Sequence, residues 1–397
     1  MEGLWQRAQA LRETLREIRR RVHQHPELGF QEVETARLAA EHLRNLGLEV
    51  REGMGRTGVV GTLGSGRPCI ALRADMDALP IQEENEVPYA SRRPGVMHAC
   101  GHDAHVACLL GAAILLAQAP PAHGQVRFLF QPCEEGGDAE GKSGAVRMIE
   151  DGAMEGVDAV VGLHVTSELE RGQVGFRAGP LMAAADRFVA TVRGRAAHAA
   201  YPHRGVDAIV LAAQVVLAIQ TVVSRRLPPT DHGVITVGVV RGGVRSNVMA
   251  DEVHLEGTIR SFTPEVRDLL AAGLRDACRI VEPLGGSYDL QVMEGFPVTL
   301  NDPELTALVR AAAVEVLGEG QVREIPPEMG SEDFSFLAQR APGCYFYLGT
   351  RTPGEPPRPA HSPTFDLDEE ALPVGAAVLS AAALRFLSRG TKPVLEP

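Results

Sequence analysis

Apolar residues recur at steps of three and four through roughly the first twenty positions, from Leu4 and Ala8 to Ile18 and Val22. This spacing places them on one face of a helix and predicts an amphipathic helix, with a second helix at 35–46. Short aliphatic runs then alternate with helical stretches. The predicted strands are 58–63, 69–73, 126–130 and 158–163, and the predicted helices are 104–118 and 144–150. This alternation predicts an α/β layer sandwich.

Residues that can bind metal stand at the ends of three predicted strands and just ahead of one predicted helix. They are Asp75, Asp77, Cys100, His102, Glu134, Glu135 and His164. In open α/β sheets, ligands bind beyond the carboxyl ends of the strands. We therefore expect these side chains to converge on one edge of the sheet.

The pattern changes between residues 183 and 297, where strands and helices follow in the order βαββαβ, which is the ferredoxin-like arrangement. The predicted strands are 187–192, 234–240, 254–261 and 288–293, and the helices are 207–224 and 264–282. We interpret 183–297 as an inserted domain. The first domain then consists of 1–182 and 298–397, and it resumes with a helix at 303–317, a strand at 344–348 and a helix at 369–387.

Composition narrows the class of protein. With 397 residues, 45% hydrophobic and 23% charged, the chain can build two cores. The net charge of −12, without a basic stripe, argues against nucleic acid and favours a small-molecule or peptide partner. There is no run of about eighteen apolar residues and no apolar signal core, so we expect no membrane span, no export signal and a cytoplasmic location. The six cysteines are expected to be reduced thiols.

A cluster of soft-ligand residues precedes the helix at 104–118. His98, Cys100, His102 and His105 fall within eight residues around Gly101. A lone buried cysteine is usually an inert core residue, but four such residues together are hard to explain as core filling. Thiolate and imidazole are preferred ligands of zinc and similar metals. We interpret Cys100 and His102 as ligands, and His98 and His105 as structural residues.

Glu134 and Glu135 form the second cluster. Adjacent acids ordinarily lie on a solvated face, but these two follow a strand with the pattern of a buried one and precede two glycines. Neighbouring carboxylates at the end of a strand point in different directions. One can therefore bind metal while the other acts as a general base on a water molecule.

The sequence resembles the hippurate-hydrolase branch of the aminoacylase and carboxypeptidase metallopeptidase family, which contains N-acyl-L-amino-acid amidohydrolases. The resemblance covers essentially the whole chain through ordered motifs. These lie at residues 21–30, 72–80, 98–105, 131–136, 162–164, 197–199, 247–251, 257–261, 330–334 and 361–363. It implies a zinc-peptidase-like catalytic domain, whose mixed sheet is sandwiched by helices, and an inserted ferredoxin-like domain that serves in dimerisation or as a lid.

The resemblance also implies a ligand set for two divalent ions, with zinc expected first and manganese, cobalt or nickel as alternatives. Cys100 would bridge the ions, and Glu134 would be the acid/base. The remaining implied ligands are His102, Glu135, His164 and His361. Asp75 and Asp77 take the place of a His-x-Asp pair in other branches, so we expect them to orient ligands rather than bind metal.

Three residues of the inserted domain receive roles from the same resemblance. His198, otherwise readable as a surface-loop histidine, would reach the active site of a partner subunit and polarise the scissile carbonyl. Asn247 and Arg260, otherwise a turn residue and a solvated cation, would bind the carboxylate of the substrate. The expected assembly is a homodimer or a dimer of dimers.

The predicted function is hydrolysis of the amide bond of N-acyl-L-amino acids, with acetyl, benzoyl or similar acyl groups, to a carboxylic acid and a free amino acid. A carboxypeptidase acting on short peptides would use the same chemistry. Two alternatives from other classes stay open. One is a cysteine hydrolase with Cys100 as nucleophile, and the other is a non-catalytic binding protein for acylated amino acids.

Overall fold

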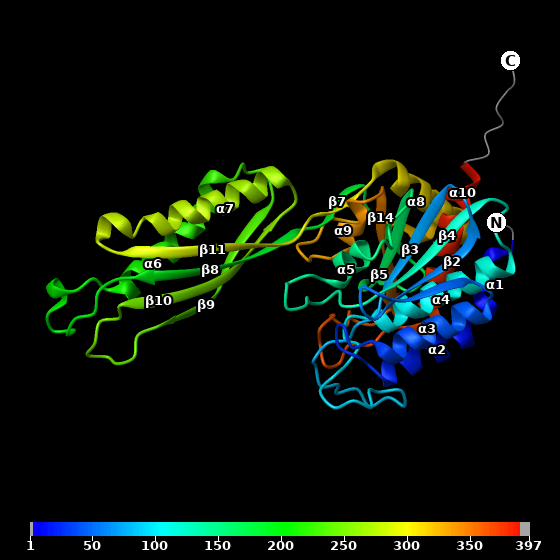
Figure 1. Cartoon of the computed structure of the whole chain (residues 1–397), viewed down its shortest axis with the longest axis horizontal. Coiled ribbons are helices and arrows are strands. Elements are labelled where there is room, and N and C mark those ends of the chain that lie inside the picture. The colour runs from blue at the N-terminus through cyan, green and yellow to red at the C-terminus, as the bar shows by residue number, and fades with distance from the viewer. Residues whose placement is uncertain (1–2, 390–397) are drawn as a thin grey trace, which may run out of the picture. The chain divides into compact units, whose positions relative to one another are not determined.

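The computed structural model describes residues 3–389, which form two compact units (Figure 1). Unit 1 contains the chain up to Leu181, the segment Leu300–Pro326 and the chain from Asp333 onward. Unit 2 contains Met182–Thr299 and the short segment Pro327–Glu332. This segment joins unit 2 because the backbone N–H of Ala183 donates to the carbonyl oxygens of Glu328 and Gly330.

Unit 1 is built on an eight-stranded mixed sheet in the order β1-β2-β4-β3-β5-β14-β6-β13. The four central strands β4, β3, β5 and β14 run parallel to one another, and β1 and β2 add antiparallel pairs at one edge. In this order the strands are Glu49–Met54, Gly58–Ser65, Gly124–Gln131, Cys69–Asp75, Ala159–Glu170, Gly343–Arg351, Val174–Phe176 and Val322–Glu324. The expected α/β fold with a mixed sheet is confirmed.

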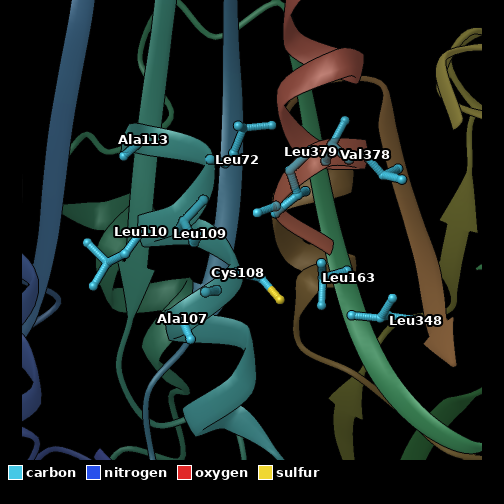
Figure 2. Close-up of a cluster of buried hydrophobic side chains, with 14 of the residues drawn as sticks. Leu72, Ala107, Cys108, Leu109, Leu110, Ala113, Leu163, Leu348, Val378 and Leu379 are labelled. Atoms are coloured by element: carbon cyan, nitrogen blue, oxygen red, sulfur yellow. The ribbon is translucent and has the colours of Figure 1, made fainter. Parts of the chain in front are cut away.

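Helices α4 (His102–Gln118) and α10 (Leu372–Ser388) cover one face of the central strands (Figure 2). Both helices are apolar on nearly all sides, which suits elements packed between a sheet and further helices. Leu163 of β5 points toward them, whereas a Cβ at the neighbouring Gly162 would contact Tyr345 and Phe334 on the opposite face. Phe334 begins α9, so the sheet has helices on both faces.

The other helices of unit 1 complete these layers. They are α1 (Leu4–Ala10), α2 (Arg12–Gln24), α3 (Val33–Asn45), α5 (Gly144–Glu150), α8 (Pro303–Leu317) and α9 (Phe334–Ala338). The short strands β7 (Gly179–Met182) and β12 (Thr299–Asn301) lie where the chain passes from one unit to the other.

Unit 2 has the predicted βαββαβ order. Its four-stranded antiparallel sheet runs β11-β8-β10-β9, and its two helices pack on that sheet over a core of their own. The elements are β8 (Ala184–Arg193), α6 (Ala208–Thr221), β9 (Gly233–Gly242), β10 (Glu252–Ser261), α7 (Pro264–Arg279) and β11 (Ser287–Phe296). Strand β9 is therefore an edge strand.

Several details differ from the sequence expectation, and three of them concern helices and strands of unit 1. The predicted N-terminal helix is two helices, because Leu11 closes α1 with a three-residue hydrogen bond to Ala8. Strand β1 was not predicted, since nearly all of it is exposed or half-buried and it lacks an apolar run. Strand β5 does not end before His164 but continues to Glu170, because β14 stays paired with it along that length.

Two helical stretches are long and apolar enough to cross a membrane by length and composition alone, Ala208–Arg226 and Glu369–Ser388. The second lies mostly inside the core of unit 1. The first packs one face against the sheet of unit 2 and leaves other apolar residues exposed. Length and composition therefore do not distinguish these helices from ordinary parts of a folded unit.

Candidate metal centre

A left-handed glycine shapes the start of α4. Gly101 has φ 90°, and a Cβ at this position would lie 2.4 Å from the side chain of Val165. Both the backbone conformation and the lack of space therefore require glycine. The turn brings the buried side chains of Cys100 and His102, on either side of Gly101, to the same centre.

Cys100 and His164 lie in contact, with 3.3 Å between the Cys100 Sγ and the His164 Nε2. The Nδ1 of His164 lies 2.7 Å from the carbonyl oxygen of Val165, to which it can only donate, so the Nε2 is left as an acceptor. Burial by itself would raise the pKa of the Cys100 thiol, but His164 and His102 outweigh burial and lower it to about 6. Cys100 is therefore readily available as a thiolate, the form that binds metal.

His102 is oriented by the segment after β3. Its Nδ1 donates to the carbonyl oxygen of Asp77 at 2.9 Å, so its Nε2 is free to accept. That Nε2 is buried and has no hydrogen-bond partner. A buried imidazole nitrogen without a partner is costly, and a metal ion at this position would satisfy it.

Glu135 and His361 complete the centre from two loops. The His361 Nε2 lies 3.0 Å from the Glu135 Oε1. His361 has a left-handed backbone, and its N–H donates to the carbonyl oxygen of Ala99, next to Cys100. Hydrogen bonds to Cys100 and Glu135 raise the pKa of His361 to about 10, so both acidic neighbours attract a positive charge there.

The five predicted ligands fall into two overlapping groups whose ligand atoms lie within 4.8 Å of one another. One group is Cys100, His102 and His164, and the other is Cys100, Glu135 and His361. Cys100 belongs to both. The donor set of one thiolate, three imidazoles and a carboxylate suits zinc and similar divalent ions, and a shared thiolate suits a pair of them.

Glu134 lies at the same centre and is 6% exposed. One of its carboxylate oxygens lies within 4.8 Å of a ring nitrogen of His102 and of a carboxylate oxygen of Glu135. The backbone N–H groups of Glu134 and Glu135 donate to the two carboxylate oxygens of Asp77, each at 3.0 Å. Asp77 thus supports both His102 and the acidic pair, as a residue that orients ligands would.

The other histidines of the cluster have a different environment. The Nδ1 of His105 lies 2.5 Å from Asp75, and its Nε2 accepts the N–H of Val165 at 3.0 Å, so neither nitrogen is available to a metal. His98 is buried, burial lowers its pKa to about 3, and neither of its ring nitrogens has a hydrogen-bond partner. The geometry therefore supports the structural interpretation of His105, and the role of His98 stays a prediction.

Unit 2 holds the three remaining predicted residues on two neighbouring loops and a strand. His198 forms an isolated β-bridge with Val248, and the N–H of Ala199 donates to the carbonyl oxygen of Asn247. His198 and Asn247 therefore lie on one continuous surface. Arg260 lies on β10, half-buried, and donates to the carbonyl oxygen of Met329 at 3.4 Å.

Sequence reasoning gave no role to a buried network beneath the acidic pair. The Arg73 guanidinium contacts Asp75 at 2.6 Å, Gln131 at 2.9 Å and Asp333 at 2.8 Å, and Gln131 also donates to Asp333. The signal available in the sequence was Arg73, a charged residue inside the otherwise apolar run 69–74. Such a residue is buried only when it is paired.

Comparison with known proteins agrees with this centre. The sequence matches peptidase family M20/M25/M40 over residues 71–385. The chain belongs to peptidase family M20/M25/M40. It is 41% identical to an N-acetyl-L-cysteine deacetylase of Bacillus subtilis, over 93% of this chain and 87% of the relative. It is also 41% identical to thermostable carboxypeptidase 2 of Saccharolobus solfataricus, over 94% and 95%.

Solved structures place the fold in the same M20/M25/M40 family. A dinuclear metal binding peptidase of Bacillus subtilis superposes with a TM-score of 0.81 at 34% identity, covering 96% of this chain and 99% of that one. The family, the fold and the class of metal-dependent hydrolase predicted from the sequence are confirmed. The roles of individual residues, the identity of the metal and the assembly stay predictions.

Proposed function

We propose that this M20/M25/M40 family member hydrolyses the amide bond of N-acyl-L-amino acids with two divalent metal ions. The observation that carries the proposal is the sharing of Cys100 between two ligand groups, with Glu134 beside them. The relative that deacetylates N-acetyl-L-cysteine supports the choice of substrate class. The reaction would release a carboxylic acid and a free amino acid.

The ions, with zinc as the first candidate, would be held by Cys100, His102, Glu135, His164 and His361, and they would supply Lewis acidity that lowers the pKa of a water molecule and polarises the amide. Glu134 then accepts the proton of the attacking water. It returns that proton to the nitrogen of the departing amino acid. Glu134 is suited to this role because its backbone is held by Asp77 while its neighbour Glu135 faces His361.

The role of Glu134 is tested by replacing it with glutamine. Glu134→Gln keeps the shape of the side chain but removes the base, so kcat should fall about a hundredfold or more while the metal content stays unchanged. Glu140→Gln is a matched control, because Glu140 is an exposed glutamate on the same connection after β4. Full activity in Glu134→Gln, or loss of its metal, would contradict the assignment.

A substrate with a free carboxylate fits the charge of the loops that carry His198 and Asn247. The loops at 194–207 and 243–251 contain three arginines, two histidines and two aspartates, although the whole chain has a net charge of −12. The arginines are Arg195, Arg204 and Arg245, all exposed, whereas Asp207 caps the start of α6. An anionic substrate would be attracted to this surface, and Arg260 could bind its carboxylate.

A homodimer would bring His198 to a partner subunit. The exposed apolar residues Ile209, Val210 and Leu217 on α6 are 50%, 55% and 63% exposed, and β9 is an unpaired sheet edge in unit 2. Both are features of a self-complementary interface. Co-expression of His198→Ala with Glu134→Gln tests the idea. About half of the dimers would be mixed, and each mixed dimer would have one site with both Glu134 and His198, so the whole population would recover about a quarter of the wild-type sites. No recovery from two inactive parents would contradict a shared site.

Carboxypeptidase activity is the second candidate, because the chain is as similar to the thermostable carboxypeptidase as to the deacetylase. A peptide is itself an acylated amino acid, so the same groups would act. The cysteine-hydrolase alternative is disfavoured because Cys100 lies among His102, His164, Glu135 and His361, more groups than a thiol nucleophile and its base require. Activity that resists chelators but is abolished by thiol alkylation would favour that alternative instead.

A further inference from the structure

The backbone that carries Glu134 and Glu135 begins in an uncommon conformation. Cys133 has φ 43°, in the left-handed region that residues with a Cβ rarely adopt. Its side chain packs closely against Gly29, where a Cβ would lie 2.7 Å from the Cys133 Sγ. The surroundings must therefore hold Cys133 in place.

Two buried carboxylates accept hydrogen bonds from three consecutive backbone N–H groups, those of residues 133–135. The N–H of Cys133 donates to the Glu32 Oε1 at 2.8 Å, and those of Glu134 and Glu135 donate to Asp77. Glu32 and Asp77 are 0% and 2% exposed. The direction in which the acidic pair leaves β4 is thus set by hydrogen bonds to two side chains from elsewhere in unit 1.

Glu32 also forms hydrogen bonds at or beside other residues with a positive φ. The described residues include four non-glycine residues with positive φ, and three of them lie at or beside a partner of Glu32: Phe30, Arg56 and Cys133. The Glu32 Oε1 accepts the N–H of Phe30 at 3.0 Å as well as that of Cys133, and its Oε2 lies 2.5 Å from the Thr57 hydroxyl, next to Arg56. Burial raises the pKa of Glu32 to about 7.

We propose that Glu32 is a positioning residue for hydrolysis, acting through the N–H of Cys133 to fix the direction of Glu134 and Glu135. This rests on the proposed function, in which Glu134 moves the proton and Glu135 holds a metal ion. Without Glu32, Cys133 relaxes toward a common backbone conformation, and the two following side chains turn with it. A displacement of about 1 Å at a reacting group lowers the rate about a hundredfold.

The geometry predicts which substitutions keep the function. Glutamine at position 32 can place its Oε1 to accept both N–H groups while its Nε2 donates to the Thr57 hydroxyl, so Glu32→Gln should retain kcat within about threefold. Glu32→Ala removes all three contacts. It should lower kcat about ten- to a hundredfold with a smaller change in KM, because the residues proposed to bind the substrate carboxylate lie elsewhere.

Glu27 provides a matched control for a merely structural effect. It is 3% exposed and, like Glu32, accepts two backbone N–H groups and one threonine hydroxyl, those of Glu34 and Thr35 at the start of α3. Glu27→Ala should therefore lower the melting temperature as Glu32→Ala does, but leave the kcat of the folded, metal-loaded enzyme unchanged. Equal kcat in both alanine variants would overturn the proposal.

Variants that remove a single hydroxyl group keep the proposal testable if Glu32→Ala does not fold. Thr57→Val and Thr35→Val each delete one hydroxyl that contacts the corresponding glutamate, and only Thr57→Val should lower kcat. A Thr57→Val enzyme as active as Thr35→Val would then overturn the proposal.

A measurement of zinc affinity distinguishes a failure of this proposal from a failure of the proposed function. Competition with a chromophoric chelator should show zinc bound about tenfold more weakly in Glu32→Ala or Thr57→Val than in the matched control, because Glu135 is displaced. This readout requires no substrate. If the wild type hydrolyses no N-acyl amino acid but the affinity still falls, the proposed function fails and the positioning role stands. If the affinity and kcat are both unchanged, the positioning role fails.

Discussion

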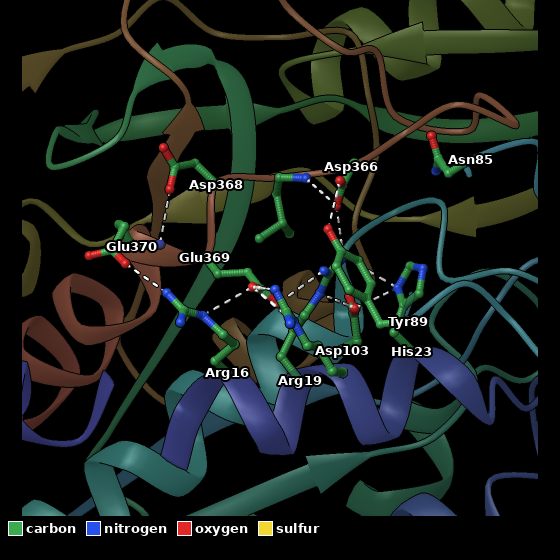
Figure 3. A network of polar contacts seen from close by, with 12 residues as sticks. Arg16, Arg19, His23, Asn85, Tyr89, Asp103, Asp366, Asp368, Glu369 and Glu370 are labelled. Atoms are coloured by element: carbon green, nitrogen blue, oxygen red, sulfur yellow. Dashed lines mark hydrogen bonds and ion pairs between the residues drawn. The ribbon is translucent and has the colours of Figure 1, made fainter. Parts of the chain in front are cut away.

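A fully buried arginine, Arg19 on α2, allows a quantitative test of the polar network behind the metal centre (Figure 3). Its Nε donates to Asp103 at 2.7 Å, and its other nitrogens contact Asp366 at 3.2 Å and Glu369 at 3.3 Å. Asp103 follows the predicted ligand His102 and is itself 0% exposed. The guanidinium therefore compensates a carboxylate that has no access to water.

Arg19→Met removes the charge but keeps an apolar side chain of similar length. Burial would raise the pKa of Asp103, but Arg19 and His23 outweigh it and hold that pKa well below its usual range. Without Arg19, a buried charge loses its main partner, which costs about 3 to 5 kcal/mol. Arg12→Gln on the same helix is the control, because the Arg12–Glu370 pair is exposed and is worth about 0 to 1 kcal/mol.

The assay is urea unfolding followed by tryptophan fluorescence. Trp5 is the only tryptophan of the chain and packs against the core of unit 1, so its signal reports on that unit. Linear extrapolation gives the free energy of unfolding for each variant. A loss in Arg19→Met of less than about 1 kcal/mol, equal to that of Arg12→Gln, would refute the claim that Arg19 compensates a buried charge.

Further predictions concern metal content and pH. Cys100→Ala should lower the zinc content from about two ions per chain to about one or fewer by plasma mass spectrometry, because a shared ligand is lost, whereas the buried Cys108→Ala should keep two. The pKa of Glu32 is raised from 4.5 to about 7, mainly by burial and also by Asp77, so the folded chain holds a proton that the unfolded chain has released. Its stabilising contribution is complete below about pH 4.5 and is lost as the pH rises through about 7, by up to about 3 kcal/mol. Unfolding at pH 5 and pH 8 should therefore show a smaller decline in Glu32→Gln than in the wild type, and equal declines would contradict the shifted pKa.

Much of the fold follows from sequence periodicity because its central elements are long and strongly patterned. Buried and more exposed residues alternate along β8, the apolar residues of α7 recur at helical steps, and α4 is apolar over a length typical of a helix. Short or half-exposed elements carry too little pattern. Strand β1 is mostly exposed, and β6 and β13 have only three residues each, so their pairing is decided by neighbours distant in the sequence.

The candidate site likewise contains residues that a local sequence pattern reveals and residues that only contacts between distant segments reveal. Cys100 and His102 stand out because soft ligands cluster beside a glycine in the sequence. His361 is a candidate ligand far along the chain, and only the family resemblance links it to the same centre. Arg73 and Glu32 received no role because their partners Asp333 and Cys133 are remote in sequence. Hydrogen bonds between distant segments leave no periodic signal, so only the folded chain displays them.

The central claim is most directly tested by measuring the amino acid released from N-acetyl-L-methionine before chelation, after chelation and after zinc is added back. The account predicts release by the purified enzyme, loss of release in the metal-free protein, and recovery that saturates at about two equivalents of zinc per chain. Release that persists in the metal-free protein, or recovery complete at one equivalent, would contradict a dinuclear metal centre built on Cys100.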